Sequence, residues 1–137
     1  MRTLLATLAA ASLLAACGGA AGPSAATRAR VCPQAYAVFK RLQSDFDSLG
    51  GGGTLAALGA DMRAVAADAG RFAGDMDDLG ARGAAAQLRT FAGDAAAVGS
   101  AADERRLSSV ATALQRLRAD SGALQTLSEV HVCAGHL

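Results

Sequence analysis

Apolar residues recur at spacings of three and four along most of the chain, and the pattern is most regular from Leu55 to Leu79. Its members are Leu55, Leu58, Met62, Val65, Ala69, Phe72, Met76 and Leu79. This spacing gathers the side chains into a narrow stripe on one face of an α-helix. Thr54, directly before the stripe, can accept a hydrogen bond from a free backbone amide, so the pattern predicts a helix capped at Thr54.

A shorter pattern precedes it and predicts a first helix over residues 33–49. The apolar face of this helix consists of Tyr36, Phe39, Leu42, Phe46 and Leu49. Pro33 suits the first position of a helix, and Gly50 suits the position just after its end. The glycines of residues 50–53 are then expected to form a linker.

Two further helical patterns follow the central one. The third segment, residues 81–98, places Ala84, Leu88, Phe91, Ala95 and Val98 on one face, and Gly99 is expected to end it. The fourth is predicted to begin with Ser100 and Asp103, a variant of the capping box. Its stripe is Leu107, Val110, Leu114, Leu117, Ser121, Leu124 and either Leu127 or Ser128. A single long, interrupted helix is the alternative for the second and third segments.

No alternating pattern of β-strands competes with these helical patterns. The predicted fold is therefore all-α, an antiparallel up-down bundle of four helices. The chain is rich in alanine, with one Tyr, four Phe and no Trp. Because each small side chain buries little apolar surface, the helices must pack closely or be held by something else.

The first sixteen residues have the order of an export signal. Arg2 is followed by an apolar run and then by small residues, and the run is shorter than the ~20 residues that cross a membrane as a helix. The run ends in Leu14-Ala15-Ala16-Cys17, which resembles the lipobox of bacterial lipoproteins. An ordinary secretory signal beside a chance cysteine is the alternative interpretation.

The resemblance covers only the leader, and it implies three things about the mature protein. Residues 1–16 would be removed as a signal peptide, and Cys17 would carry a diacylglyceryl lipid that anchors the chain outside the cytoplasm. Residues 17–31, which begin with small residues, would be a flexible tether. Residues 32–137 would then form the helical domain.

Two cysteines remain once Cys17 is assigned to a lipid. An exported protein meets oxidising surroundings, so Cys32 and Cys133 are expected to form a disulfide. An even number of up-down helices brings these two positions together, whereas an odd number would separate them by a helix length of about 27 Å. A free thiol, an intermolecular disulfide, or a metal site with His131 and His136 are the alternatives.

The net charge of the chain argues against nucleic acid and anionic lipid as partners. The chain has 13 basic and 12 acidic residues, and removal of the leader removes Arg2, which leaves 12 of each. A neutral chain of this kind lacks the basic stripe that nucleic acid requires, so no nucleic-acid partner is expected. The chain is also expected to have no polybasic patch for anionic lipid.

Few residues suggest chemistry. Asp61, Asp68 and Asp75 recur every seven residues and could line a cation- or partner-binding edge, or pair with Arg71 and with arginines of a neighbouring helix. Met62 and Met76 could ligate copper or haem, but as core residues they need no such role. A calcium loop beginning at Asp75 is also incomplete.

No nucleophile elbow, phosphate loop or Glu-x-x-His repeat is present, so an enzyme is not expected, and neither a cofactor nor a metal is assigned. The predicted function is that of a lipid-anchored bundle in the cell envelope, acting as a structural or interaction module with an unknown envelope partner. The alternative is a carrier of a small ligand or metal, with a cavity between alanine-rich helices.

Overall fold

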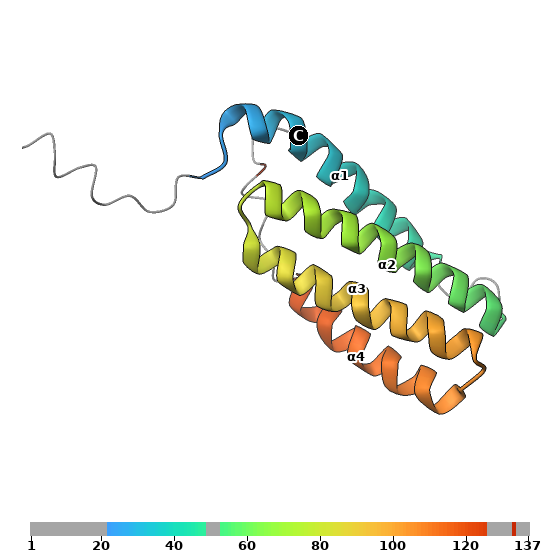
Figure 1. Cartoon of the computed structure of the whole chain (residues 1–137). Helices are drawn as coiled ribbons and strands as arrows, with labels where there is room; N and C mark the ends of the chain where they lie inside the picture. The colour runs from blue at the N-terminus through green and yellow to red at the C-terminus, as the bar shows by residue number, and fades with distance from the viewer. Residues whose placement is uncertain (1–21, 49–52, 126–132, 134–137) are drawn as a thin grey trace, which may run out of the picture.

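The computed structural model describes residues 22–48, 53–125 and 133, and these residues form four helices. They are α1 (Ala25–Asp47), α2 (Leu55–Asp78), α3 (Arg82–Asp103) and α4 (Leu107–Gln125). The helices run up and down in turn, and each packs mainly on the next along the chain, with α2 and α3 most closely associated (Figure 1). The predicted all-α bundle is therefore confirmed.

All four helices contribute to the centre of the core. Phe91 of α3 is fully buried there, and it is surrounded by small and medium-sized side chains from every helix. The buried members of this cluster are Leu42, Met62, Val65, Ala69, Phe91, Ala95, Val98, Ala113 and Leu117. Because the members on α2 and α3 include two alanines and two valines, these two backbones lie close together, as an alanine-rich core requires.

The prediction for α2 is confirmed in both its start and its buried face. The backbone N–H of Ala57 donates to the Thr54 hydroxyl at 3.1 Å, which satisfies one of the free amides of the first turn. The predicted stripe faces the interior. Its buried members are Met62, Val65, Ala69, Met76 and Leu79, and its partly buried members are Leu55, Leu58 and Phe72.

The turn between α2 and α3 separates them into two helices, so the alternative of a single interrupted helix is wrong. Gly80 has a φ of 76°, in the left-handed region that glycine adopts at little cost. With the chain turned there, the N–H of Ala81 donates back to the carbonyl of Met76 at 2.8 Å. This pattern is the Schellman end of a helix.

The start of α1 differs from the prediction. The helix begins at Ala25, where the Ser24 hydroxyl accepts from the N–H of Thr27 at 3.1 Å, and Pro33 lies inside it. Part of the expected tether, residues 25–31, is therefore helical. Proline lacks only one helical hydrogen bond, to the carbonyl four residues earlier, and a capped first turn with tertiary packing sustains the helix across it.

The buried face of α1 also differs from the prediction. Val31, Ala35 and Val38 pack inward with Leu42, whereas Tyr36 and Phe39 are 46% and 39% exposed. The disulfide at Cys32 fixes which side of the helix faces the bundle, and that side carries small side chains that allow close approach. The side chain of Phe46 and all of Leu49 lie outside the described residues.

The end of α3 is a second correction. Gly99 does not end the helix, which continues to Asp103, so Ser100 and Asp103 belong to its last turn rather than to a cap of α4. The chain reverses at Arg105, whose φ is 55°, and the N–H of Arg106 donates to the carbonyl of Ala101. An arginine in a conformation that favours glycine gives no sequence signal of a turn.

Gly99 instead allows α2 and α3 to approach each other. A Cβ at Gly99 would lie 3.3 Å from the carbonyl oxygen of Gly59, and a Cβ at Gly59 would lie 2.6 Å from a carboxylate oxygen of Asp103. The two glycines therefore face each other where the backbones are closest. A side chain at Gly99 would press on the backbone of α2, whereas one at Gly59 would first displace the carboxylate of Asp103.

The helix α4 begins at Leu107, and Leu107 itself is 67% exposed rather than part of the core. Val110 and Leu117 are buried as expected, and Leu114 and Ser121 are partly buried. The remaining predicted positions lie outside the described side chains. They are Leu124, Leu127, Ser128 and His131. Among the described helices, none is long and apolar enough to span a bilayer.

Candidate functional site

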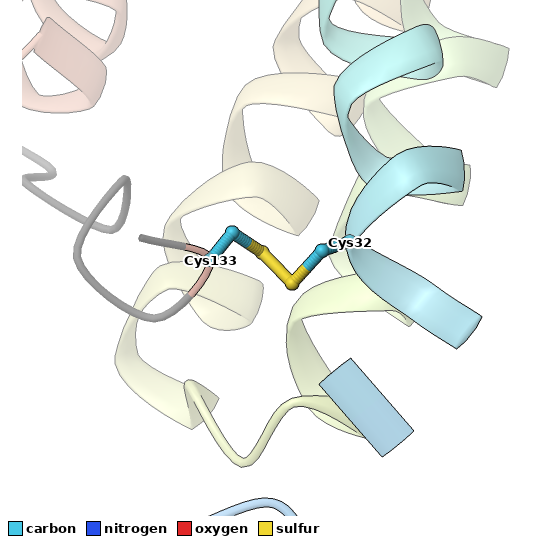
Figure 2. Close-up of a disulfide and its surroundings, with 2 residues drawn as sticks. All are labelled: Cys32 and Cys133. Carbon is cyan, nitrogen blue, oxygen red and sulfur yellow. A yellow bond between two sulfur atoms is a disulfide. The ribbon is translucent and has the colours of Figure 1, made fainter. Parts of the chain in front are cut away.

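The disulfide between Cys32 and Cys133 joins the start of α1 to the chain beyond α4. The two sulfur atoms are 2.05 Å apart, and the two Cα atoms are 5.6 Å apart (Figure 2). The disulfide predicted from the number of cysteines is confirmed. The even number of helices that this disulfide requires is confirmed as well. Both ends of the helical domain therefore meet at one end of the bundle.

The bridge is part of the core rather than a reactive site. Cys32 and Cys133 are both buried, and they pack in a cluster beside the turn between α2 and α3. The other buried members of that cluster are Val31, Ala35, Ala73, Met76, Leu79, Ala84, Ala85 and Leu88. A buried disulfide is poorly accessible to thiols, and its sulfurs cannot act as thiolate ligands of a metal.

Cys17, the predicted lipid-attachment residue, lies outside the described residues. His131 and His136, the imidazoles of the alternative metal site, also lie outside them. With Cys133 in a disulfide, the thiolate that this site needed is no longer free. What the structure adds for Cys17 is the position of the first helix, which starts at Ala25 and leaves only residues 18–24 between them.

The acidic row on α2 is used for ion pairs at Asp68. This carboxylate is only 7% exposed, and it accepts from the Nη1 of Arg71 at 3.1 Å, while its other oxygen lies 3.6 Å from the Nε of Arg41 on α1. The predicted pairing with Arg71 and with an arginine of a neighbouring helix is therefore confirmed. The pair with Arg41 connects α1 to α2.

Two further carboxyl groups, Asp75 of this row and Asp45 on α1, have raised pKa values. Burial raises the pKa of Asp45, and the neighbouring charge of Asp68 adds to the effect. Burial also raises the pKa of Asp75, with a smaller contribution from Asp78. Among the described residues no group of three or more His, Cys, Asp or Glu side chains could hold a metal ion. The row therefore gives no geometric support for a calcium site.

Met62 and Met76 lie in different parts of the core. Met62 belongs to the central cluster around Phe91, and Met76 belongs to the cluster around the disulfide. Both are buried by apolar neighbours. They do not converge on a common site, and their role is to fill the core.

A pair of carboxyl groups between α3 and α4, Asp94 and Asp120, was not among the residues expected from the sequence. A side-chain hydrogen bond with Asp120, which favours the protonated form of Asp94, is the main cause that raises the pKa of Asp94, followed by burial, while Arg116 acts in the opposite direction. Two like charges at one junction favour the protonated form of one of them. No sequence pattern relates these two positions, because they come together only through helix packing.

An open groove of about 360 Å³ lies along α3 and α4. Its lining combines alanines with hydroxyl groups and two arginines. The lining residues are Ala97, Ala101, Arg106, Ser108, Ser109, Thr112, Ala113 and Arg116. The groove is open to solvent, in contrast to the closed cavity between helices that a carrier was expected to have.

The structure thus defines the class of the protein as an all-helical bundle whose two ends are joined by a buried disulfide. Beyond that class, the chain matches no known protein family, no curated protein and no solved structure.

Proposed function

We propose that this protein is a lipid-anchored module of the bacterial cell envelope, held on the non-cytoplasmic side of a membrane through Cys17. Its role is structural or interactive, with an envelope protein as partner, and involves neither catalysis nor nucleic acid. The observation that carries the proposal is the sequence Leu14-Ala15-Ala16-Cys17 at the end of an export signal. Two further features support it.

The first supporting feature is the use of the cysteines. Disulfides persist in exported proteins and are rare in the cytoplasm, so the bridge between Cys32 and Cys133 favours export. Of the three cysteines in the chain, Cys17 is the one that this bridge does not use. That cysteine is the residue that the lipobox pattern selects for modification.

The second supporting feature is the arrangement of the bundle relative to the anchor. The start of α1, the disulfide and the turn between α2 and α3 share one end, while the end of α1, the start of α2 and the α3–α4 turn lie at the other (Figure 1). With a lipid on Cys17, the first end would be near the membrane. The second end would point away from it and be accessible to a partner.

Lipidation can be tested by growing the producing bacterium with an alkyne analogue of palmitate and measuring the label on the purified protein. We expect the wild type to carry label and to have a mature mass that begins at Cys17. Cys17→Ala should lose the label, whereas the matched control with Cys32→Ala and Cys133→Ala should keep it. An unlabelled wild type, or label that persists in Cys17→Ala, would overturn the proposal.

The groove on α3 and α4 favours a second candidate function, the binding of a small ligand. Arg106 is paired with Glu104, but Arg116 and the hydroxyl groups suit an anionic compound with a small apolar part, since arginine binds carboxylates and phosphates in a bidentate manner. Native mass spectrometry of protein from its own host should then detect a bound compound. Thr112→Leu should remove it, and Thr90→Leu, on an exposed site outside the groove, should not. A mass without any bound compound would count against this function.

A further inference from the structure

The exposed side of α1 carries large aromatic side chains that the core does not use. Tyr36 and Phe39 are 46% and 39% exposed, although the core is otherwise built largely from alanine and valine. The ring of Phe39 lies 6.0 Å from the ring of Phe72, which is partly buried on α2. Three of the five aromatic residues in the chain therefore form one surface. Aromatic side chains gathered on one exposed face of a helix are available for an interaction.

The charge of α1 differs from that of the other helices. No acidic residue precedes Asp45 anywhere in the chain, whereas Arg28, Arg30, Lys40 and Arg41 all lie on α1 before it. Arg41 is paired with Asp68 and Arg28 is partly buried, whereas Arg30 and Lys40 are exposed and have no carboxylate partner among the described residues. The neutral charge of the whole chain thus hides a local excess of positive charge beside the aromatic surface.

The cation and the aromatic ring are arranged as at a membrane interface. The Nζ of Lys40 lies 5.9 Å from the centre of the Tyr36 ring, which places both side chains on the same side of α1. Tyrosine combines an apolar ring with a polar tip, and lysine can bury its stem while its ammonium group stays in water. Such residues are enriched where a protein meets lipid headgroups.

The position of α1 gives this surface access to a bilayer. Residues 18–24 span at most about 25 Å when fully extended, and Tyr36 lies about 17 Å along the helix from Ala25. The surface therefore stays near the anchor. A second copy of the chain suits it less well, because a symmetric contact would bring the cations of one α1 against those of the other.

We propose that Tyr36, Phe39 and Lys40, with Arg30 nearer the anchor, form a docking surface for the headgroups of an anionic bilayer. This inference rests on the proposed lipid anchor and adds the orientation of the protein on the membrane. The lipid holds the protein near the bilayer, and the α1 surface lays the bundle against it. Stable binding of a protein to a membrane usually takes more than one contact, and the α1 surface adds one to the lipid.

Tyrosine fluorescence tests the proposal, because Tyr36 is the only tyrosine and the chain has no tryptophan. The lipidated protein would be purified from host membranes and reconstituted into vesicles of phosphatidylcholine, with or without phosphatidylglycerol. We expect acrylamide to quench Tyr36 less on the anionic vesicles, and high salt to restore quenching, because the attraction is electrostatic.

Two variants and one control identify the surface. Phe39→Ser removes an apolar contact, and Lys40→Glu should weaken docking by at least about fivefold, since each cation near an anionic surface contributes. Both should make quenching equal on the two kinds of vesicle. Leu107→Ser changes an exposed apolar residue at the start of α4 and should leave the difference intact. Far-UV circular dichroism would confirm that all three remain helical.

The outcomes separate the two proposals. If the protein does not incorporate into vesicles, the anchor is wrong, and the docking surface is wrong with it. If it incorporates but Tyr36 is quenched equally on both kinds of vesicle, docking alone is overturned. Protection of Tyr36 that depends on protein concentration and not on phosphatidylglycerol would also overturn it, in favour of self-association or a protein partner.

Discussion

The α2–α3 junction and the α1–α2 junction are held in different ways. At the first, Gly59 and Gly99 bring two backbones together, and the ion pairs Arg63–Asp103 and Arg89–Asp77 connect the helices along their length. At the second, the contacts include one partly buried ion pair, between Arg41 and Asp68, and two partly exposed phenylalanine rings. A covalent bond at Cys32 then joins α1 to the far end of the chain.

This difference indicates that close packing stabilises the centre of the bundle, whereas a crosslink keeps its first helix in place. An alanine-rich pair of helices gains stability only when the backbones are near enough for many short contacts. The helix α1 instead presents its largest side chains outward, so it has less apolar surface to bury against α2. The four predictions that follow test this contrast.

Removal of the disulfide should have the largest effect. The bridge closes a loop of 101 residues, so Cys32→Ala with Cys133→Ala should lower the free energy of unfolding by about 4 kcal/mol. Urea unfolding followed by circular dichroism measures this change. Hydrogen exchange should show that α1 loses more protection than α2 and α3. A uniform loss over all four helices would contradict the contrast between the two junctions.

A side chain at Gly99 should disrupt the other junction. Gly99→Val places atoms against the carbonyl of Gly59, and separating the two helices should cost about 2 kcal/mol of the free energy of unfolding. Gly70→Val is the matched control, because a Cβ there meets nothing within 4 Å. Thermal unfolding should show the control to be unchanged or slightly more stable, since valine favours the helix more than glycine does. Equal effects at both sites would contradict the close approach.

The ion pair between α1 and α2 should contribute less. Asp68→Asn removes the charge that Arg41 and Arg71 share, and it should cost about 1 kcal/mol because both arginines remain largely in water. The control is Asp61→Asn, one heptad earlier, where the described residues provide no ion pair. Urea unfolding of the two variants compares them. A loss at Asp61 as large as that at Asp68 would show that the pairing is not the cause.

The smallest effect should be a gain in the free energy of unfolding when Asp45 is replaced. Burial and the charge of Asp68 raise the pKa of this carboxyl, so the folded protein binds its proton more tightly than the unfolded chain does. The stabilisation from the proton is complete below the unfolded pKa and is lost as the pH rises through the folded pKa. Asp45→Asn should therefore stabilise the protein by a few tenths of a kcal/mol at neutral pH.

Thermal unfolding as a function of pH measures the effect at Asp45. The advantage of asparagine should be absent at low pH, grow above 3.8, the ordinary pKa of an aspartate, and level off towards neutrality. Asp47→Asn, on the exposed last turn of α1, is the control and should show no such rise. An advantage that is the same at every pH would contradict the raised pKa.

The sequence is sufficient to predict the number of helices and the disulfide that joins the two ends of the helical domain. The stripe from Leu55 to Leu79 is confirmed because a long heptad pattern has one consistent helical solution. The disulfide follows from counting cysteines, since assigning Cys17 elsewhere leaves one pair. Its geometry in turn requires an even number of helices.

Helix boundaries and the face of α1 are predicted less well, for identifiable reasons. Glycine is common at helix ends, but Gly99 lies inside α3, where its lack of a side chain allows α2 to approach at Gly59. The true turn is at Arg105, a residue type that gives no such signal. On α1 the pattern assigns the larger side chains to the core, whereas packing beside Cys32 selects smaller ones. Contacts between helices, such as Asp94 with Asp120, leave no periodic trace in one sequence.

The position of the disulfide also determines how the protein responds to mechanical force. Tension applied between the N-terminal part of the chain and residue 133 passes through the bond at Cys32, because this is the shortest covalent path. Only residues 25–31 of α1 lie in that path, and stretching them adds at most about 15 Å, because they already span about 10 Å as a helix. The rest of the bundle lies in a closed loop that carries no tension. A pull between these two points can therefore unwind the first turns of α1 without opening the core.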